Sequence, residues 1–324
     1  MPINIKGRSL VSMLEFSFVE IDYLINSAIE LKRLKNQRVF PKNLSNRNIA
    51  LIFDRPSCRT RTSFVVAASD EGAHLEIFPY EDIRFGIKES VKDIARVFGR
   101  MFDGIAYRGD HSTLLELVEY AGIPVWNSLT ESYHPTQVLA DLMTIKERFG
   151  QLKGIKLAYV GDGRNNVVNS LIIGCLKMGV DLKIVTPNEL APSLELLKSI
   201  KEDCADELFG SVIVTDNIEE GVRDCHIIYG DVWISMGEEH LIEERIALLS
   251  KYKVTQELMS LTDNDETIYL HCLPALHDQN TIISQNHPDI MEVSEDVFES
   301  PRSFVFDQAE NRMHTIKALM NATI

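Results

Sequence analysis

The sequence has few cysteines and no long apolar run. Its five cysteines are scattered and include no Cys-x-x-Cys pair, so neither a disulfide framework nor a zinc site is indicated and we expect reduced thiols. Residues 1–16 lack the continuous apolar core of a signal peptide, and no segment approaches the ~18 apolar residues of a membrane span. These absences predict a cytoplasmic protein with no membrane partner.

Basic residues are also fewer than acidic ones. Lys and Arg number 33 against 48 Asp and Glu, a formal net charge of −15. Nucleic acids and anionic membranes require a basic surface, so neither is an expected partner. An anionic substrate would need a local cluster of cations to bind against this overall charge.

The order of apolar segments predicts two α/β domains, as does a length of 324 residues. In the first half we expect helices at 16–34, 60–71, 89–101 and 137–149, and strands at 48–53 and 75–78. In the second half we expect strands at 156–160, 182–185, 212–215, 226–229 and 268–272, with helices at 169–178 and 193–202. Alternating strands and helices form parallel sheets, which bind ligands at the carboxyl ends of the strands. Gly150 follows a long helix and is the expected domain boundary.

The segment after strand 48–53 is a candidate anion site. It runs from Asp54 through Pro56 into a helix whose first turn carries Arg59 and Arg61. Arginine at a helix N-terminus opposes the helix dipole by about 0.3–1 kcal/mol, whereas a bound phosphate would reverse this cost and accept bidentate hydrogen bonds. On these residues alone, arginines that face solvent or pair with acids are an equally good interpretation.

The turn at 161–166 partly matches a dinucleotide-binding fingerprint. Asn166 stands where the third glycine belongs, and Asp181 begins its strand, whereas the ribose-binding acid belongs at the far end. A nicotinamide cofactor is therefore disfavoured. Amide side chains here suit a small polar ligand, or cap the following helix.

Two further strand ends and the last helix carry polar candidates. Asp231 could hold an ammonium group and Ser235 a carboxylate, although an isolated aspartate more often caps a turn. Cys272 follows His271 at the end of an apolar strand and is either catalytic or a core residue. In the final helix, Arg312 is the functional candidate.

Taken together, these segments resemble one known family over nearly the whole chain. The motifs that carry the match are SCRTR at 57–61, FDGIAYR at 102–108, HPTQ at 134–137, GDGRNN at 161–166, DVWISMG at 231–237, HCLPALHD at 271–278 and FDQAENRMHTIK at 306–317. On them the sequence is identified as a member of the ornithine carbamoyltransferase family. The resemblance implies two α/β domains, each a parallel sheet flanked by helices, joined by bridging helices. It also implies a homotrimer, which could form multiples of trimers, and no metal or organic cofactor.

The resemblance further implies carbamoyl transfer from carbamoyl phosphate to L-ornithine, in arginine metabolism. Residues 1–150, with helix 308–324 packed back on them, would bind carbamoyl phosphate, and residues 151–307 ornithine. The implied carbamoyl phosphate site is Ser57, Cys58, Arg59, Thr60, Arg61, Arg84, Arg108, His134, Gln137, Cys272, Leu273 and Arg312. The implied ornithine site is Asn166, Asp231, Ser235 and Met236. Those implied to act in catalysis are Arg108, His134, Asp231 and Cys272.

Two positions depart from the family pattern. Cys58 replaces a threonine, which leaves its backbone N–H for phosphate but removes the hydroxyl. Arg84 replaces a glutamine in a loop that, in the family, reaches the neighbouring subunit's site, and this loop resembles that of the phaseolotoxin-insensitive variety. The family also implies a cis peptide bond between Leu273 and Pro274.

Three alternatives stay open beside this interpretation. The first is the disfavoured nicotinamide-dependent dehydrogenase. The second is a regulatory relative without turnover, which we expect to lack one or more of Arg108, His134, Asp231 and Arg312; all four are present. The third is a sibling transferase that uses putrescine or an N-acylated ornithine. The direction of the reaction in the cell also stays open.

Overall fold

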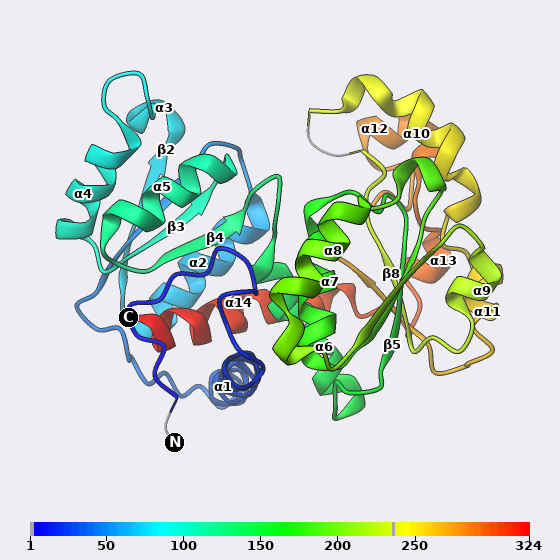
Figure 1. Ribbon diagram of the computed structural model, residues 1–324, viewed down its shortest axis with the longest axis horizontal. Helices are drawn as coiled ribbons and strands as arrows, with labels where there is room; N and C mark the ends of the chain where they lie inside the picture. The colour runs from blue at the N-terminus through cyan, green and yellow to red at the C-terminus, as the bar shows by residue number, and fades with distance from the viewer. Residues whose placement is uncertain (1–2, 235–236) are drawn as a thin grey trace. The chain divides into compact units, whose positions relative to one another are not determined.

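The computed structural model describes residues 3–234 and 237–324, so Ser235 and Met236 lie outside the described residues. It contains two compact units, Met1–Met143 with Glu310–Ile324, and Thr144–Ala309. Each holds one parallel β-sheet flanked by helices, which confirms the predicted α/β class (Figure 1). Two helices, α6 (Pro135–Phe149) and α14 (Val305–Thr323), each begin in one unit and end in the other.

The first unit contains a four-stranded parallel sheet in the order β2-β1-β3-β4. Its strands are β1 (Asn48–Phe53), β2 (His74–Pro79), β3 (Gly104–Arg108) and β4 (Val125–Leu129). One face is covered by α4 (Val91–Met101) and α5 (His111–Ala121) (Figure 1). Ile52 and Ile105 pack against these helices because alternate side chains of a strand face the same side.

The opposite face of this sheet packs on α2 (Cys58–Glu71) and the C-terminal part of α14. Phe64 of α2 stacks on Trp126 of β4 with ring centroids 6.2 Å apart. The indole N–H of Trp126 donates to Thr323 Oγ1 at 3.1 Å. The last turns of the chain are therefore part of the first unit's core.

Local signals in the sequence set the ends of the helices in this unit. Ser17 and Glu20 form a capping box at the start of α1 (Phe18–Asn36). Gly72 ends α2 at φ 80°, a left-handed conformation that glycine adopts without strain.

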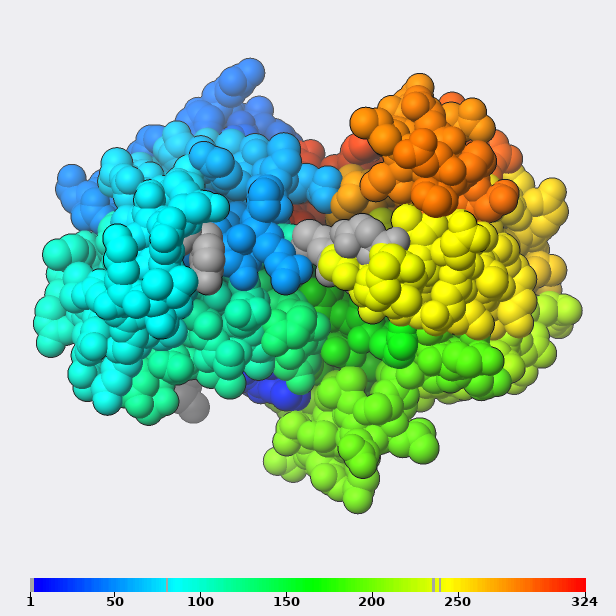
Figure 2. All heavy atoms as spheres, turned by 90° about the horizontal axis from the view of Figure 1, so that it is seen from above, coloured from blue at the N-terminus to red at the C-terminus, as the bar shows by residue number. Residues whose placement is uncertain are grey.

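The second unit contains a five-stranded parallel sheet in the order β7-β6-β5-β8-β9. Its strands are β5 (Lys156–Val160), β6 (Asp181–Val185), β7 (Ser211–Thr215), β8 (Ile227–Gly230) and β9 (Ile268–His271). Its helices are α7 (Asn166–Met178), α8 (Leu194–Asp203), α9 (Ile218–Val222), α10 (Ile242–Leu249), α11 (Gln256–Ser260), α12 (Ile282–Asn286) and α13 (Glu295–Phe298). The first unit also contains the short helix α3 (Tyr80–Ile83). Figure 2 shows the surface of this unit, with α12 in orange on a raised part of it.

The core of the second unit joins the sheet to the helices after β8. Val160, Ile228 and Tyr269 pack with Leu249 of α10 and Phe298 of α13. The other face of the sheet is covered by α7, whose residues are almost all buried. Within the described residues, no helix combines the length and the hydropathy needed to cross a bilayer.

Most strands in the second half lie where the sequence predicts them, and β1 and β5 have the predicted bounds. In the first half, the sequence did not predict β3, β4 or α5. The strand predicted at 75–78 is longer by one residue at each end, and the helix predicted at 60–71 begins at Cys58.

Candidate active site

The N-terminus of α2 follows directly from the carboxyl end of β1. Ser57 is the N-cap, with extended backbone, and its hydroxyl makes no capping hydrogen bond to the helix. Cys58 is the first helical residue and is exposed. The first turn contains no acidic residue, so Arg59 and Arg61 add positive charge to a helix end that is already positive. This end of α2 is suited to an anion.

A chain of buried side chains connects this turn to two other helices of the first unit. Arg312 of α14 is 4% exposed and donates to Thr60 Oγ1 and, at 2.9 Å, to Gln137 Oε1. Gln137 on α6 in turn donates to Asp141 Oδ1 at 2.8 Å. Three of the predicted site residues, separated widely in the sequence, thus lie in one hydrogen-bonded chain.

Arg108 is the last residue of β3 and is 7% exposed. Burial lowers the pKa of its guanidinium to about 10; the carboxyl of Asp54 acts in the opposite direction, and Arg59 and Arg55 lower it further. At neutral pH the group is still a cation. It is held near other cations at the carboxyl end of the sheet, an arrangement that favours binding of an anion with several oxygens.

His134 precedes α6 and is buried. Burial, together with the charges of Arg312, Arg108 and Arg59, holds the pKa of His134 well below its usual value. Its ring is therefore neutral at pH 7, with one nitrogen that donates and one that accepts. Nδ1 lies 3.4 Å from Thr136 Oγ1. If that hydroxyl donates to Nδ1, the proton of the neutral ring is on Nε2.

In the second unit, Asp231 follows β8 and accepts hydrogen bonds from several segments. Cys272 Sγ donates to Oδ1 at 2.9 Å, and the Val232 N–H donates to the same oxygen at 2.8 Å. The amide of Asn165 donates to Oδ2 at 2.8 Å, and Tyr159 O–H lies 3.4 Å from it. The structure therefore brings together Asp231 and Cys272, two residues that the sequence placed at the ends of different strands.

The environment of Asp231 determines its charge. Burial raises the pKa of its carboxyl above the usual value, and hydrogen bonds from Cys272, Val232 and Asn165 act in the opposite direction without cancelling that rise. A buried carboxylate that accepts this many hydrogen bonds is suited to one more donor, such as a ligand ammonium group. The predicted site residues of the second unit therefore differ in charge from those of the first unit.

The turn at 161–166 is a helix cap in this structure. Asn165 Oδ1 accepts from Val168 N at 2.9 Å at the start of α7, while its Nδ2 is the donor to Asp231. Asn166, the predicted ornithine ligand, is the first residue of α7 and is partly buried. The sequence thus singled out the residue next to the one that contacts Asp231.

The remaining predicted site residues lie on loops. The peptide bond between Leu273 and Pro274 is cis, as the family resemblance implied. Arg84 is exposed on the segment after α3, and its Nε donates to Glu81 O at 3.0 Å. Whether Arg84 reaches a neighbouring subunit stays a prediction.

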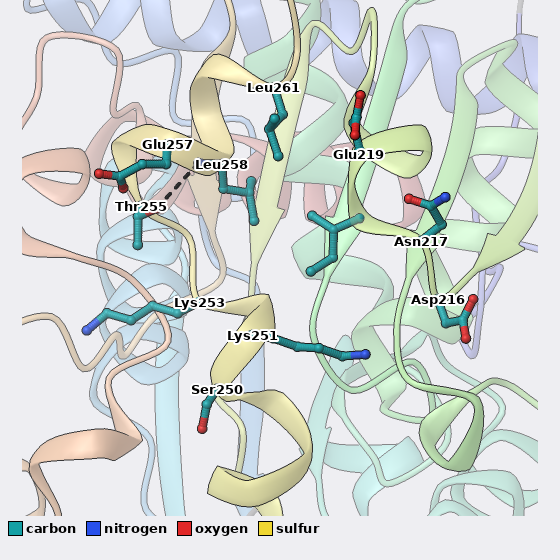
Figure 3. Close-up of a pocket in the computed structure, with 11 residues that line it drawn as sticks. Asp216, Asn217, Glu219, Ser250, Lys251, Lys253, Thr255, Glu257, Leu258 and Leu261 are labelled. Carbon is teal, nitrogen blue, oxygen red and sulfur yellow. Dashed lines mark hydrogen bonds between the residues drawn. The ribbon is translucent and has the colours of Figure 1, made fainter.

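A hollow of about 590 Å³ lies elsewhere on the second unit, beyond the end of β7 (Figure 3). Lys251, Leu258 and Glu219 are among the residues that line it, and none of the predicted site residues does. Across residues 3–234 and 237–324, no group of three or more His, Cys, Asp or Glu side chains is arranged to hold a metal ion.

Comparison with known proteins assigns the two halves of the chain. The carbamoyl-P binding domain of aspartate/ornithine carbamoyltransferases matches residues 8–147, and the Asp/Orn binding domain matches residues 153–323. The chain belongs to the aspartate/ornithine carbamoyltransferase family.

Individual members of this family are similar over nearly their full length. A phaseolotoxin-insensitive ornithine carbamoyltransferase 2 of Pseudomonas syringae pv. actinidiae is 55% identical, over 99% of this chain and 98% of the relative. A catabolic ornithine carbamoyltransferase of Bacillus licheniformis is 50% identical, over 99% and 98%. The structure of the Pyrococcus furiosus ornithine carbamoyltransferase superposes with a TM-score of 0.91 at 35% identity, covering 99% of this chain and 98% of that one.

The sequence motifs predicted the site residues themselves better than the residues that contact them. Asp54, Asp141 and Tyr159 touch or influence the predicted site residues but were not predicted. Asn165 was expected as one of the two amides that bind a ligand or cap the helix, and the structure confirms the cap. An aspartate four residues after Gln137 on a helix was the one available signal, since side chains at i and i+4 are neighbours.

Proposed function

We propose that this protein transfers the carbamoyl group of carbamoyl phosphate to the δ-amino group of L-ornithine, giving L-citrulline and phosphate, in arginine metabolism. The observation that best supports this is the buried contact of Arg312 with Thr60 and Gln137, which assembles donor-site residues from three motifs. The family's two substrate-binding domains, which match the two halves of the chain, also support it.

The first unit binds the donor. Backbone N–H groups of residues 57–61 and the side chains of Arg59 and Arg61 hold the phosphate. Their positive charge also stabilises the phosphate as it leaves. Cys58 contributes its backbone N–H, and its exposed thiol is not needed. Arg84, from a neighbouring subunit of a homotrimer, adds a further cation.

Arg108, His134 and Thr60 polarise the carbamoyl carbonyl. Arg108 stays charged because its pKa of about 10 lies well above neutral pH. His134, with its lowered pKa, donates a hydrogen bond as a neutral ring and adds no further repulsion among the arginines. Gln137 holds the carbamoyl amide, Cys272 and Leu273 complete the donor site, and Arg312 orients Gln137 and Thr60.

The second unit binds ornithine. Asp231 anchors the α-ammonium group, Asn166, Ser235 and Met236 complete the site, and Cys272 lies near the δ-nitrogen. The neutral δ-amine attacks the carbamoyl carbon to form a tetrahedral intermediate. The carbon–oxygen bond to phosphate then breaks, and the proton lost by the nitrogen passes to the departing phosphate. The protein supplies no nucleophile; it orients the substrates and stabilises charge, and it requires no metal or organic cofactor.

The test is citrulline formation from carbamoyl phosphate, with ornithine, putrescine, aspartate and N-acetylornithine compared side by side. We expect turnover with ornithine at a kcat/KM at least about a hundredfold above each of the others. N-acetylornithine leaves the buried carboxylate of Asp231 without an ammonium partner, putrescine lacks the α-carboxylate, and aspartate lacks the δ-amine. Preference for putrescine or acetylornithine would replace the proposed acceptor. No turnover with any amine would contradict the function.

A further inference from the structure

A buried acid of the second unit, Glu292, contacts both sides of the turn that carries Cys272. It is 2% exposed and lies before α13, remote in sequence from the turn. Its Oε1 accepts from the Leu276 N–H at 2.7 Å and lies 3.2 Å from His271 Nε2. His271 precedes Cys272, and Leu276 follows the cis-proline turn. One carboxyl oxygen therefore joins the two ends of the turn.

The hydrogen bonds of His271 determine which nitrogen of its ring carries the proton. Nδ1 accepts from the Leu273 N–H at 2.9 Å, so in the neutral ring the proton is on Nε2, which faces Glu292. The backbone N–H of His271 donates to Gln308 Oε1 at 2.9 Å. The ring is 1% exposed and cannot exchange these partners for water.

The His271 ring has room beside Glu292 because residue 230 of β8, its neighbour in the sheet, is a glycine. A Cβ at Gly230 would lie 2.4 Å from Tyr269 Oη and 3.2 Å from His271 Cδ2. The backbone of Glu292 is held independently, because Val254 N–H donates to its carbonyl at 2.9 Å. The acid is thus a fixed point against which the turn is positioned.

We propose that Glu292 is a positioning residue that acts through His271 and Leu276 to hold the turn at 272–275, so that Cys272 donates its hydrogen bond to Asp231. The relevance of this turn to turnover rests on the proposed function. The contact between Cys272 and Asp231 does not depend on the proposed function, and it can be tested in the free enzyme without substrate.

The test is alkylation of the free enzyme by iodoacetamide, with each cysteine quantified by peptide mass spectrometry. In the wild type, the Cys272 thiol donates to Asp231 and should react slowly, because the thiolate is the nucleophile. Glu292→Ala releases the turn and should accelerate labelling of Cys272 by about tenfold. Glu292→Gln keeps an oxygen for both contacts and should label within about threefold of the wild-type rate.

Three buried cysteines of the same unit report on unfolding: Cys175, Cys204 and Cys225. They should stay unlabelled in both variants. A matched control is Glu71→Ala in the first unit, since Glu71 is also buried and accepts a backbone N–H, from Asn43 at 3.1 Å. That variant should melt at a lower temperature and leave the Cys272 rate unchanged.

Equal Cys272 rates in Glu292→Ala and the wild type would overturn the proposal. Labelling of the three buried cysteines in step with Cys272 would also overturn it, since Glu292 would then support the fold generally. An acceleration by Glu292→Gln as large as that by Glu292→Ala would exclude the hydrogen-bonding role. If the expected labelling is found in an enzyme that forms no citrulline, the proposed function fails while the role of Glu292 stands.

Discussion

At the strand ends of the first unit lie arginines and a neutral histidine; at those of the second unit lie a buried carboxylate and a thiol. Both units are parallel sheets flanked by helices, so the architecture does not produce this difference. The charge comes from single residues such as Arg108 and Asp231, each placed directly at or after a strand.

The comparison shows how an acidic protein can bind an anion. The formal net charge is −15, yet Arg59, Arg108 and Arg312 act together on the pKa of His134. Local desolvation strengthens these interactions relative to the field of distant surface acids, which salt screens. One unit is thereby suited to a phosphorylated donor and the other to an amine.

The largest effect should follow removal of a cation from the first unit. Arg108→Ala should lower kcat about 10²–10³-fold, the usual contribution of one oxyanion donor. Steady-state citrulline assays measure it. Arg33→Ala is the control, because Arg33 is exposed and pairs with Glu30 on the same helix. An unchanged kcat in Arg108→Ala would remove this residue from the reaction.

Removal of the negative charge of Asp231 in the second unit should affect the use of ornithine and not that of carbamoyl phosphate. Asp231→Asn should lower kcat/KM for ornithine roughly 10- to 100-fold, because a hydrogen bond between charged groups is lost. Initial rates at varied substrate should show the KM for carbamoyl phosphate within about threefold of the wild-type value. Asp206→Asn, at an exposed position, is the control. Equal losses for both substrates would contradict the division of roles between the units.

The pH profile should separate the two units. The rate should rise from pH 6.5 to 9, because the δ-amine has a pKa of ~10.4 and must lose its proton to react. His134 has a lowered pKa and is already neutral at pH 6.5, so no separate step should occur there. Above about pH 10 the rate should fall as Arg108 loses its proton. A flat profile, or a loss of rate between pH 6.5 and 9, would contradict this scheme.

The smallest effect should come from restoring the family's usual residue at the start of α2. Cys58 is exposed, and we expect only its backbone N–H to contact the donor, so Cys58→Thr should change the KM for carbamoyl phosphate by less than about threefold. Titration of the donor at fixed ornithine measures this. A tenfold gain in affinity would show that the missing hydroxyl matters.

The sequence predicted strands well where they are continuous apolar runs. β1 and β5 are of this kind, and their bounds were correct. β4 contains Asn127 and Ser128, both completely buried, so it carries no continuous apolar signal. β3 is equally buried but ends in Arg108, and it was read as a functional motif alone.

The sequence predicted site residues that belong to a motif, but it did not predict the contacts that connect distant segments. Thr60, Gln137 and Arg312 were predicted from three motifs, and the structure connects them. The contact of Asn165 with Asp231 and that of Glu292 with His271 were not predicted, because they exist only once the strands are assembled.

The most direct test of the account is a crystal of the protein soaked with carbamoyl phosphate. We expect the phosphate oxygens to accept hydrogen bonds from backbone N–H groups of residues 57–61 and from Arg59 and Arg61, at about 2.7–3.2 Å. The carbamoyl oxygen should lie within the same distance of Arg108, His134 and Thr60. Density for the donor elsewhere, with Arg59 and Arg61 directed into bulk water, would contradict the central claim.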